Sequence, residues 1–332
     1  MLKKKQNIIN HIWYEKNIFC YFLFPISLLY RFIISMRKFL YKIKLFKSHK
    51  INIPVIVVGN ITVGGTGKTP LVIALVKSLQ KQGFSPAVIT RGYGGKNKVW
   101  PHYVDENSDP LLVGDEAVLI AKNTGVPVVA GPNRVADALL LLRRDKSRLY
   151  ECNIIISDDG LQHYALARDI EIAVIDSTRR FGNGFCLPAG PLREPKNRLK
   201  TVDFIVANGK ANPGEFEMQF VIDDIINLND NNKKLNLSEL SHKKIMAVAG
   251  IGNPERFFES LRACTISFTT KIFPDHHAFS KNDFDCIHAD IILMTEKDAI
   301  KCNSFADDRF CVVRGHAVID EMLFQAVIAR TK

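Results

Sequence analysis

A glycine-rich segment of the chain has the residue types and spacing to bind the phosphates of a nucleotide: Gly59-Asn60-Ile61-Thr62-Val63-Gly64-Gly65-Thr66-Gly67-Lys68-Thr69-Pro70. It follows a short apolar run at 53–58 and precedes a stretch with helical periodicity that stops at Gly83. Strand, glycine loop and helix are the context that a phosphate-binding loop (P-loop) requires. Backbone N–H groups would cradle the β-phosphate, Lys68 would reach the β and γ oxygens, and the Thr69 hydroxyl would hold Mg²⁺. The predicted nucleotide-binding residues are Thr62, Val63, Gly64, Gly65, Thr66, Gly67, Lys68 and Thr69.

The loop departs from the usual pattern G-x-x-x-x-G-K-[ST] at one position, because the first glycine is replaced by Thr62. Gly64 and Gly65 are expected to supply the turn instead. At the ordinary frequency of glycine, G-G-x-G-K-T arises by chance at roughly one position in a million. The match therefore favours nucleotide binding over coincidence.

Two adjacent acids, Asp158 and Asp159, follow the apolar run at 153–157. A buried strand that ends in Asp is how a P-loop enzyme presents a carboxylate to Mg²⁺ or to its water shell. Such a pair is costly at the edge of an α/β sheet unless a cation lies there. The alternative is a turn with an Asx cap. We predict that Asp158 and Asp159 contact the metal.

Other polar clusters follow predicted strands or precede predicted helices. Asp115 comes directly before a helical stretch and, taken alone, could be its N-cap. Arg193 and Glu194 lie in a Gly/Pro-rich loop at 181–195 and could meet an anionic or hydroxyl-rich substrate. His276 and His277 are adjacent, but a metal site would need a third ligand of fixed spacing, and none is evident. A further polar cluster, 295–298, follows an apolar run at 291–294.

The order of these patterns predicts four regions. Residues 1–50 form a basic amphipathic helical region, 51–208 a P-loop domain, 209–244 an exposed polar connection and 245–332 a C-terminal α/β domain. The last region begins with a strand, a glycine turn and a helix, but its turn does not complete G-x-G-x-x-G, so no dinucleotide site is expected. The predicted fold class is α/β, with a P-loop NTPase-type parallel sheet, a second, smaller α/β domain and an N-terminal membrane-contacting helix.

The positive charge of the chain is concentrated at the N-terminus. Residues 1–50 contain eleven Lys or Arg residues against one acid, Glu15, so they carry +10 of the total charge of +11. A nucleic-acid-binding protein would spread its basic footprint over the folded surface, so no nucleic-acid partner is expected. The content of 47% hydrophobic and 24% charged residues excludes disorder, a fibrous repeat and a polytopic membrane protein. The seven cysteines include no C-x-x-C pair, which favours reduced thiols in a cytosol over disulfides or zinc.

The N-terminal region combines an apolar run with basic residues. The run at 18–30 is uncharged, but it is shorter than the ~20 residues of a spanning helix, and Pro25 would kink it. No cleavage pattern of a signal peptide follows. From Arg37 to Lys47, Lys and Arg are interspersed with aromatic and aliphatic residues, as in a segment that lies among lipid headgroups. The alternative is a helix packed on the protein's own core. We expect contact with an anionic membrane surface.

Taken together, the motifs VGNITVGGTGKTP, TRGYGG, VGDE, SDDGLQH, FGNG…LPAGPLREP, FPDHH and TEKD resemble, in order and over nearly the whole chain, the tetraacyldisaccharide 4'-kinases of lipid A biosynthesis. The resemblance implies phosphorylation by ATP of the 4'-hydroxyl of a tetraacylated glucosamine disaccharide 1-phosphate. It places the enzyme at the cytoplasmic face of the bacterial inner membrane, as a peripheral protein whose N-terminal helix contacts the bilayer. It also implies two α/β units joined by a thin connection. No obligate protein partner is expected.

The resemblance assigns a catalytic pair to Asp115 and the motif histidine, which falls on His276, although the motif offers His277 as well. The chemistry is reasonable, because a sugar hydroxyl is a poor nucleophile and needs a base within hydrogen-bond reach. Lys68, Mg²⁺ and the loop amides would stabilise the transferring phosphoryl group. We therefore expect Asp115, His276 and Lys68 to be catalytic, and Arg193, Glu194 and His277 to bind the acceptor.

A different class of protein could share part of this pattern. Membrane-associated partitioning or positioning ATPases combine an amphipathic anchor with K-G-G-x-G-K-[ST], but the first Lys of that motif is Val63 here. A nucleotide-regulated membrane-binding module without transfer chemistry would not need Asp115 and a distant histidine. Both alternatives are weaker than the kinase.

Overall fold

The computed structural model describes residues 12–15, 18–143, 150–230, 233–240 and 242–331. The predicted N-terminal region at 1–50 therefore lies partly outside the described residues. The strands that are described form one continuous mixed sheet in the order β11-β10-β12-β13-β8-β7-β6-β1-β5-β2-β4-β3, with β9 paired to β8.

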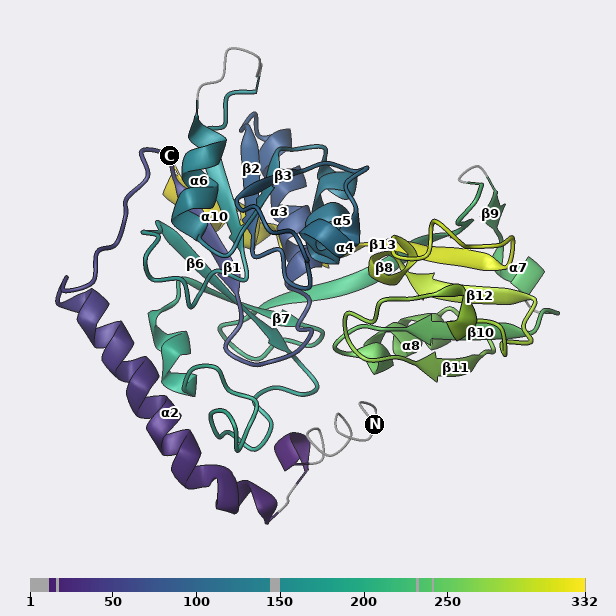
Figure 1. Ribbon diagram of the computed structural model, residues 1–332, viewed down its shortest axis with the longest axis horizontal. Coiled ribbons are helices and arrows are strands. Elements are labelled where there is room, and N and C mark those ends of the chain that lie inside the picture. Colours follow the sequence, from purple (N-terminus) through teal and green to yellow (C-terminus); the bar gives the residue numbers. More distant parts are fainter. Residues whose placement is uncertain (1–11, 16–17, 144–149, 231–232, 241, 332) are drawn as a thin grey trace.

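The first unit contains the P-loop and the predicted parallel sheet (Figure 1). Its strands are β1 (Val55–Gly59), β2 (Pro86–Thr90), β3 (His102–Val104), β4 (Val128–Ala130), β5 (Ile154–Asp158), β6 (Ile170–Asp176) and β7 (Phe204–Asn208). Its helices are α3 (Lys68–Lys81), α4 (Pro110–Val113), α5 (Asp115–Thr124), α6 (Arg134–Leu142), η1 (Lys196–Thr201) and, from the end of the chain, α10 (Glu321–Thr331). All pairs are parallel except β3 with β4.

The apolar runs of the sequence become the central strands because both faces of this sheet are covered. Every residue of β1, β2 and β5 is buried, as expected for parallel strands between helices. On α3 the buried residues recur at helical spacing and pack on the sheet. They are Leu71, Val72, Leu75, Val76 and Leu79. The predicted α/β class is confirmed.

The second unit is a smaller α/β sheet with its own core. Its strands are β8 (Phe216–Asn227), β9 (Lys234–Leu235), β10 (Ile245–Ala249), β11 (Thr269–Ile272), β12 (Ile291–Thr295) and β13 (Phe310–Ile319). Its helices are α7 (Leu237–Leu240), α8 (Pro254–Ala263), η2 (Lys281–Asp283) and α9 (Glu296–Ala299). Phe257, Phe258 and Leu261 of α8 are buried against β10 and β12.

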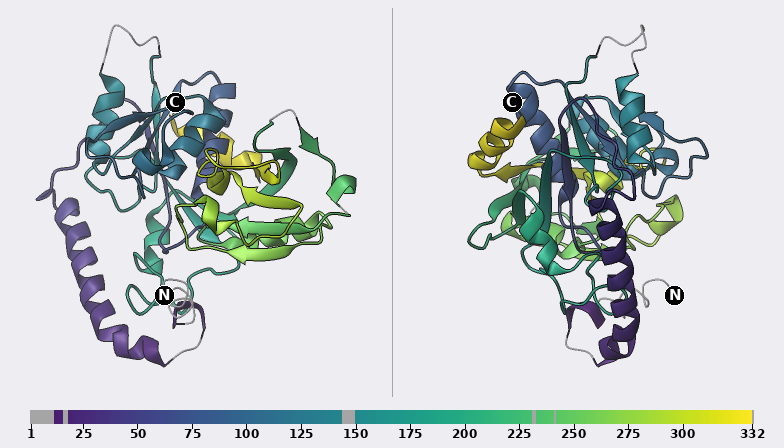
Figure 2. Two further views of the ribbon diagram at one scale, coloured as in Figure 1. Left: turned by 45° about the vertical axis from the view of Figure 1, so that its right-hand side comes forward. Right: turned by 90° about the vertical axis from the view of Figure 1, so that its left-hand side faces the viewer.

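The two units are joined by a long antiparallel pair, β8 with β13, which runs between the two halves of the molecule in Figures 1 and 2. Residues 209–244, predicted as an exposed connection, therefore contain a 12-residue strand, whose Ile225 and Ile226 are buried. The chain then returns to the first unit, because α10 packs its Leu323 and Val327 into the same core as α3.

Helix α2 (Phe19–Lys42) extends along one edge of the first unit and stands apart from its sheet (Figures 1 and 2). It continues through Pro25 and Arg31, so it is longer than the uncharged run of the sequence. By length and composition it could cross a membrane, although such a helix near an N-terminus is weak evidence. Only 11% of its most apolar window is buried, so α2 is not a core helix. Its exposed apolar side chains include Phe19, Phe22, Ile26, Leu29, Phe32, Ile33, Met36 and Phe39.

The middle of α2 is fixed to the folded body by polar contacts. The hydroxyl of Ser27 donates to the carbonyl of Cys186 at 2.8 Å and accepts from the Ala189 amide at 3.0 Å. The Tyr30 hydroxyl donates to the carbonyl of Arg193 at 3.0 Å. The helix therefore lies along the loop at 181–195.

Replacing Phe258 by Ala should weaken the second unit, because the side chain is 1% exposed and its removal leaves a cavity. The expected loss is about 3–5 kcal/mol, measured as the free energy of opening from amide hydrogen exchange in β10 and β12. Phe22→Ala is the matched control, since that ring is 75% exposed and its removal should cost less than about 0.5 kcal/mol. Equal effects of the two substitutions would contradict this packing.

Candidate active site

The P-loop connects β1 to α3 with glycines at the positions where the backbone turns. Gly64 and Gly67 have φ angles of 106° and 93°, in the region that favours glycine. A Cβ on Gly67 would lie 2.3 Å from Nδ2 of Asn208. Gly65 has an ordinary φ, and its amide nitrogen would lie 2.4 Å from a Cβ on Gly252 of the second unit. Of the two glycines predicted to make the turn, only Gly64 adopts a positive φ, while Gly65 allows close approach of the other unit.

The position that departs from the usual P-loop pattern is extended. Thr62 forms an isolated antiparallel bridge with Leu192, and the Val63 amide donates to the carbonyl of Pro191 at 2.8 Å. No turn is made at Thr62, so this position does not require a glycine. The entry to the P-loop is thus bound to the loop at 181–195.

The second unit contacts the P-loop through a polar network. Asn208 donates to the carbonyl of Thr66 at 3.1 Å and accepts from Arg256 at 2.5 Å. Arg179 donates to the carbonyl of Gly252 at 2.8 Å. The predicted glycine turn after β10 therefore packs against the P-loop and has no ligand motif of its own.

Lys68 begins α3 and faces the acids at the end of β5. Its Nζ lies 3.4 Å from Oδ1 of Asp159, and Nη1 of Arg193 lies 2.9 and 3.0 Å from the two oxygens of the same carboxylate. Burial raises the pKa of Asp159, but the charges of Lys68 and Arg193 outweigh it and hold the pKa far below its ordinary value. Asp159 is therefore ionised, and it pairs with both Lys68 and Arg193.

Asp158 is in a different environment, although it is the adjacent residue. It pairs in register with Val58 of β1, is fully buried, and neither of its carboxylate oxygens has a hydrogen-bond partner. Burial, followed by the nearby charge of Glu116, raises the pKa of Asp158 to about 7. Unsatisfied buried oxygens at a strand end fit a hard cation such as Mg²⁺.

Side chains alone do not build a metal site here. Within the described ranges, no group of three or more His, Cys, Asp or Glu residues could hold an ion. P-loop enzymes in general bind Mg²⁺ through few side-chain ligands, together with phosphate oxygens and water.

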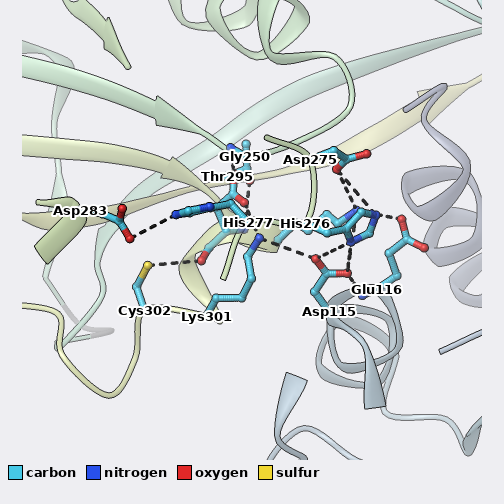
Figure 3. Close-up of polar contacts among 12 residues, drawn as sticks. Asp115, Glu116, Gly250, Asp275, His276, His277, Asp283, Thr295, Lys301 and Cys302 are labelled. Atoms are coloured by element: carbon cyan, nitrogen blue, oxygen red, sulfur yellow. Dashed lines mark hydrogen bonds and ion pairs between the residues drawn. The ribbon is translucent and has the colours of Figure 1, made fainter. Parts of the chain in front are cut away.

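The predicted pair of Asp115 and a histidine is in direct contact, although its members are 161 residues apart. Nδ1 of His276 lies 3.0 and 3.1 Å from the two oxygens of Asp115 (Figure 3). Asp115 is the first residue of α5, with Gly114 at the cap position, so it is not the helix N-cap. His276 follows β11 in the second unit. The two units therefore meet at this pair.

The neighbouring histidine points to other groups. Nε2 of His277 lies 3.2 Å from Oδ2 of Asp283, and its ring stacks on Phe273 with centroids 4.8 Å apart. The structure thus pairs Asp115 with His276, which the sequence had left open.

Charge and hydrogen bonding tune the pair in opposite directions. Burial lowers the pKa of His276, but the hydrogen bond and charge of Asp115, with the charge of Asp275, raise it above its ordinary value. Burial raises the pKa of Asp115, but His276, Lys297 and Lys301 lower it below its ordinary value. Asp115 is thus ionised and increases the basicity of the imidazole.

Glu116 links this pair to the P-loop. Burial raises its pKa, but the charges of Lys297 and Lys68 lower it below the ordinary value. The charge of the P-loop lysine therefore acts on the residue next to Asp115 in α5. In the sequence, Glu116 belongs to the VGDE motif and residues 295–298 form the TEKD motif, but no role was predicted for either.

The loop at 181–195 contributes Arg193 and Glu194, which differ in what they contact. Arg193 reaches the carboxylate of Asp159. Glu194 is buried, and its two oxygens accept from Gln162 at 2.7 Å and from Tyr164 at 2.5 Å. In this structure Glu194 therefore holds the loop to the segment after β5.

A parallel sheet with a P-loop, a buried acid on the adjacent strand and a carboxylate–histidine pair where the two units meet defines a phosphotransferase of the P-loop type. Residues 19–332 match the family model of the tetraacyldisaccharide-1-P 4'-kinases. The chain belongs to the tetraacyldisaccharide 4'-kinase family.

Curated relatives carry the name tetraacyldisaccharide 4'-kinase. The chain is 48% identical to that of Nitrosococcus oceani (92% of this chain and 89% of the relative) and 47% identical to that of Methylobacillus flagellatus (96% and 94%). Its fold is similar to that of LpxK from Aquifex aeolicus, solved in complex with ATP, with a TM-score of 0.77 and 28% identity over 95% of this chain and 100% of the other. These likenesses favour the kinase family over the partitioning or positioning ATPases.

Asp115→Asn should lower the pKa of His276, because it removes the charge that raises it. Because the pKa of His276 is raised in the folded chain, its contact with Asp115 stabilises the fold fully below the ordinary pKa of histidine. This stabilisation is lost as the pH rises through the raised pKa of His276. Asp115→Asn should therefore weaken the contact mainly at acidic pH. An NMR titration of the His276 imidazole measures the shift. Asp223→Asn, next to the exposed His316, is the control. An unchanged His276 titration in Asp115→Asn would contradict the assigned contact.

Proposed function

We propose that the chain transfers the γ-phosphoryl group of ATP to the 4'-hydroxyl of a tetraacyldisaccharide 1-phosphate, the lipid A precursor, with Asp115 and His276 acting on that hydroxyl. As a member of its family the chain is a kinase that phosphorylates a hydroxyl group. One observation carries the assignment of the base: the contact of 3.0 Å between His276 and Asp115, made across the two units.

The nucleotide would bind with its phosphates on the loop from Thr62 to Gly67. Lys68 would leave Asp159 and neutralise the β and γ oxygens, while the loop amides donate to them. Thr69 and Asp158, with Asp159 as its neighbour, would hold Mg²⁺. When bound, Mg²⁺ neutralises phosphate oxygens and orients them.

His276 would act as the general base. Its Nδ1 hydrogen is donated to Asp115, so the lone pair of Nε2 faces away from the carboxylate and can accept the hydroxyl proton. As the proton moves to Nε2, the 4'-oxygen forms a bond to the γ-phosphorus and the bond to the ADP oxygen breaks. Ionised Asp115 stabilises the imidazolium that results.

Arg193, Glu194 and His277 would border the acceptor. When Lys68 turns to the nucleotide, Arg193 would stay next to Asp159 as a donor for acceptor oxygens, and Glu194 would keep its loop in place. His277 shares the turn of His276 and would contact the sugar.

Helix α2 would hold the enzyme as a peripheral protein on the anionic cytoplasmic face of the inner membrane. Its apolar side chains are exposed, and Lys and Arg residues accompany them towards its C-terminal end. The contacts of Ser27 fix the middle of the helix to the folded body, which favours a helix lying in the interface over one that spans the bilayer.

The kinase assignment predicts that the full chain with Mg-ATP phosphorylates the disaccharide 1-phosphate in detergent micelles. Asp115→Ala should lower kcat by about 10²–10⁴-fold, because it removes the group that orients the base, and it should change ATP affinity little. Product analysis by mass spectrometry and ATP binding by calorimetry measure the two quantities. Intact ATP binding without any phosphorylated lipid would reject the proposal, and equal losses of turnover and affinity would assign Asp115 to nucleotide binding.

The membrane assignment predicts that Phe22→Asp with Phe32→Asp reduces sedimentation with anionic vesicles at least about tenfold, because two charges would enter the acyl boundary. Val99→Asp is the matched control, since Val99 is 71% exposed but lies outside α2. Unchanged sedimentation of the α2 variant would refute this docking face.

A further inference from the structure

Lys297 is the second residue of α9, and its ammonium lies among carboxylates from both units. Its Nζ is 2.9 Å from Oε1 of Glu116, 3.9 Å from Oδ1 of Asp115 and 3.9 Å from Oδ1 of Asp275. Glu116 and Asp115 begin α5 in the first unit, whereas Asp275 precedes His276 in the second. The side chain of Lys297 is 15% exposed, so water screens these interactions only in part.

Without a cation at this point, like charges would face each other where the units meet. The need for a nearby cation is clearest at Asp275, because its Oδ1 is buried and has no hydrogen-bond partner. The side-chain nitrogens that the contacts of the described chain place near that oxygen are Nζ of Lys297 and Nε2 of His276, at 3.9 and 3.7 Å, and the positive charge comes from Lys297. Repulsion between Asp275 and the acids of α5 would separate His276 from Asp115.

Lys301 lies one helical turn further on and cannot replace Lys297. Its Nζ is 2.8 Å from Asp298 of its own unit and 3.7 Å from Oδ2 of Asp115. It therefore supports Asp115 but reaches neither Glu116 nor Asp275 in the contacts of the described chain. Of these two lysines, Lys297 is the one that joins Asp275 of the second unit to the acids of α5.

We propose that Lys297 is a positioning residue that draws Asp115 and Glu116 of the first unit to Asp275 of the second, and so holds His276 on Asp115. This rests on the proposed function for its consequence in catalysis. Lys297 acts through the carboxylates and does not itself exchange a proton with the acceptor. It gives a role to the polar cluster after β12.

The test compares Lys297→Met, which keeps the length of the side chain without its charge, with Lys234→Met. Lys234 makes an ion pair of the same length, 2.9 Å to Asp224, but is 61% exposed. Lys297→Met should lower kcat about 10- to 100-fold with ATP binding within about threefold, because the base is displaced while the P-loop is intact. Lys234→Met should leave both unchanged. A kcat of Lys297→Met within twofold of the unsubstituted chain would overturn the proposal.

Lys297→Arg separates loss of charge from loss of fold. It should bind ATP and turn over at least about fivefold faster than Lys297→Met, because it restores a cation between the units. Equal turnover of the two variants, with ATP bound by both, would overturn the role of the charge.

An NMR measurement that needs no lipid substrate tests the positioning role of Lys297 separately from the proposed kinase activity. The ¹⁵N signal of Nδ1 in His276, at one fixed pH, should move in Lys297→Met towards that of an exposed histidine and stay in place in Lys234→Met. An unchanged signal in Lys297→Met would overturn the positioning role even if the lipid is phosphorylated. Absence of phosphorylated lipid with the unsubstituted chain would instead reject the proposed function.

Discussion

The contact between Asp115 and His276 is the interaction on which the rest of the site depends. Its two members come from different units and are separated by 161 residues, so no local structure can form it. The β8–β13 pair and the return of α10 to the first core fix the path of the chain, and the turn after β11 then brings His276 to the start of α5. A carboxylate that is buried and ionised has a fixed orientation, which is what a base needs from its partner.

The same arrangement connects helix α2 to the P-loop through short contacts. Ser27 and Tyr30 of α2 bind the loop at 181–195, and that loop pairs with Thr62 at the entry of the P-loop. Arg193 of the same loop reaches Asp159, the partner of Lys68. The surface proposed to meet lipid and the site proposed to transfer phosphate therefore share one loop as a common support.

The parts of this site that could be predicted from the sequence are those whose signal is local. A β-branched run, glycines and a helix define the P-loop, and an apolar strand that ends in Asp defines Asp158, because the carboxyl ends of parallel strands meet at one edge. The resemblance to a family added the expectation that Asp115 works with a distant histidine. The structure pairs Asp115 with His276 and not with His277. The sequence could not separate these two residues, because they are both histidines and are adjacent in one turn.

What escaped prediction depends on the tertiary fold. The polar segment at 209–244 contains β8 because one end of that strand pairs with β7 and the rest with β13, which lies far along the chain. Helix α2 continues through Pro25, although proline removes one backbone donor from the interior of a helix. Lys297 lies in a polar cluster that follows a predicted strand, which the sequence shows. Its partners Asp115 and Glu116 belong to the other unit, so only the tertiary structure identifies them.

A double-mutant cycle tests the central claim most directly, namely that Asp115 and His276 act as one unit. kcat would be measured for Asp115→Asn, His276→Gln and the double variant, each shown to bind ATP. If the carboxylate works only through the imidazole, the double variant will be about as slow as His276→Gln alone. Multiplication of the two single effects in the double variant would contradict the account, because it would mean that the two residues act independently.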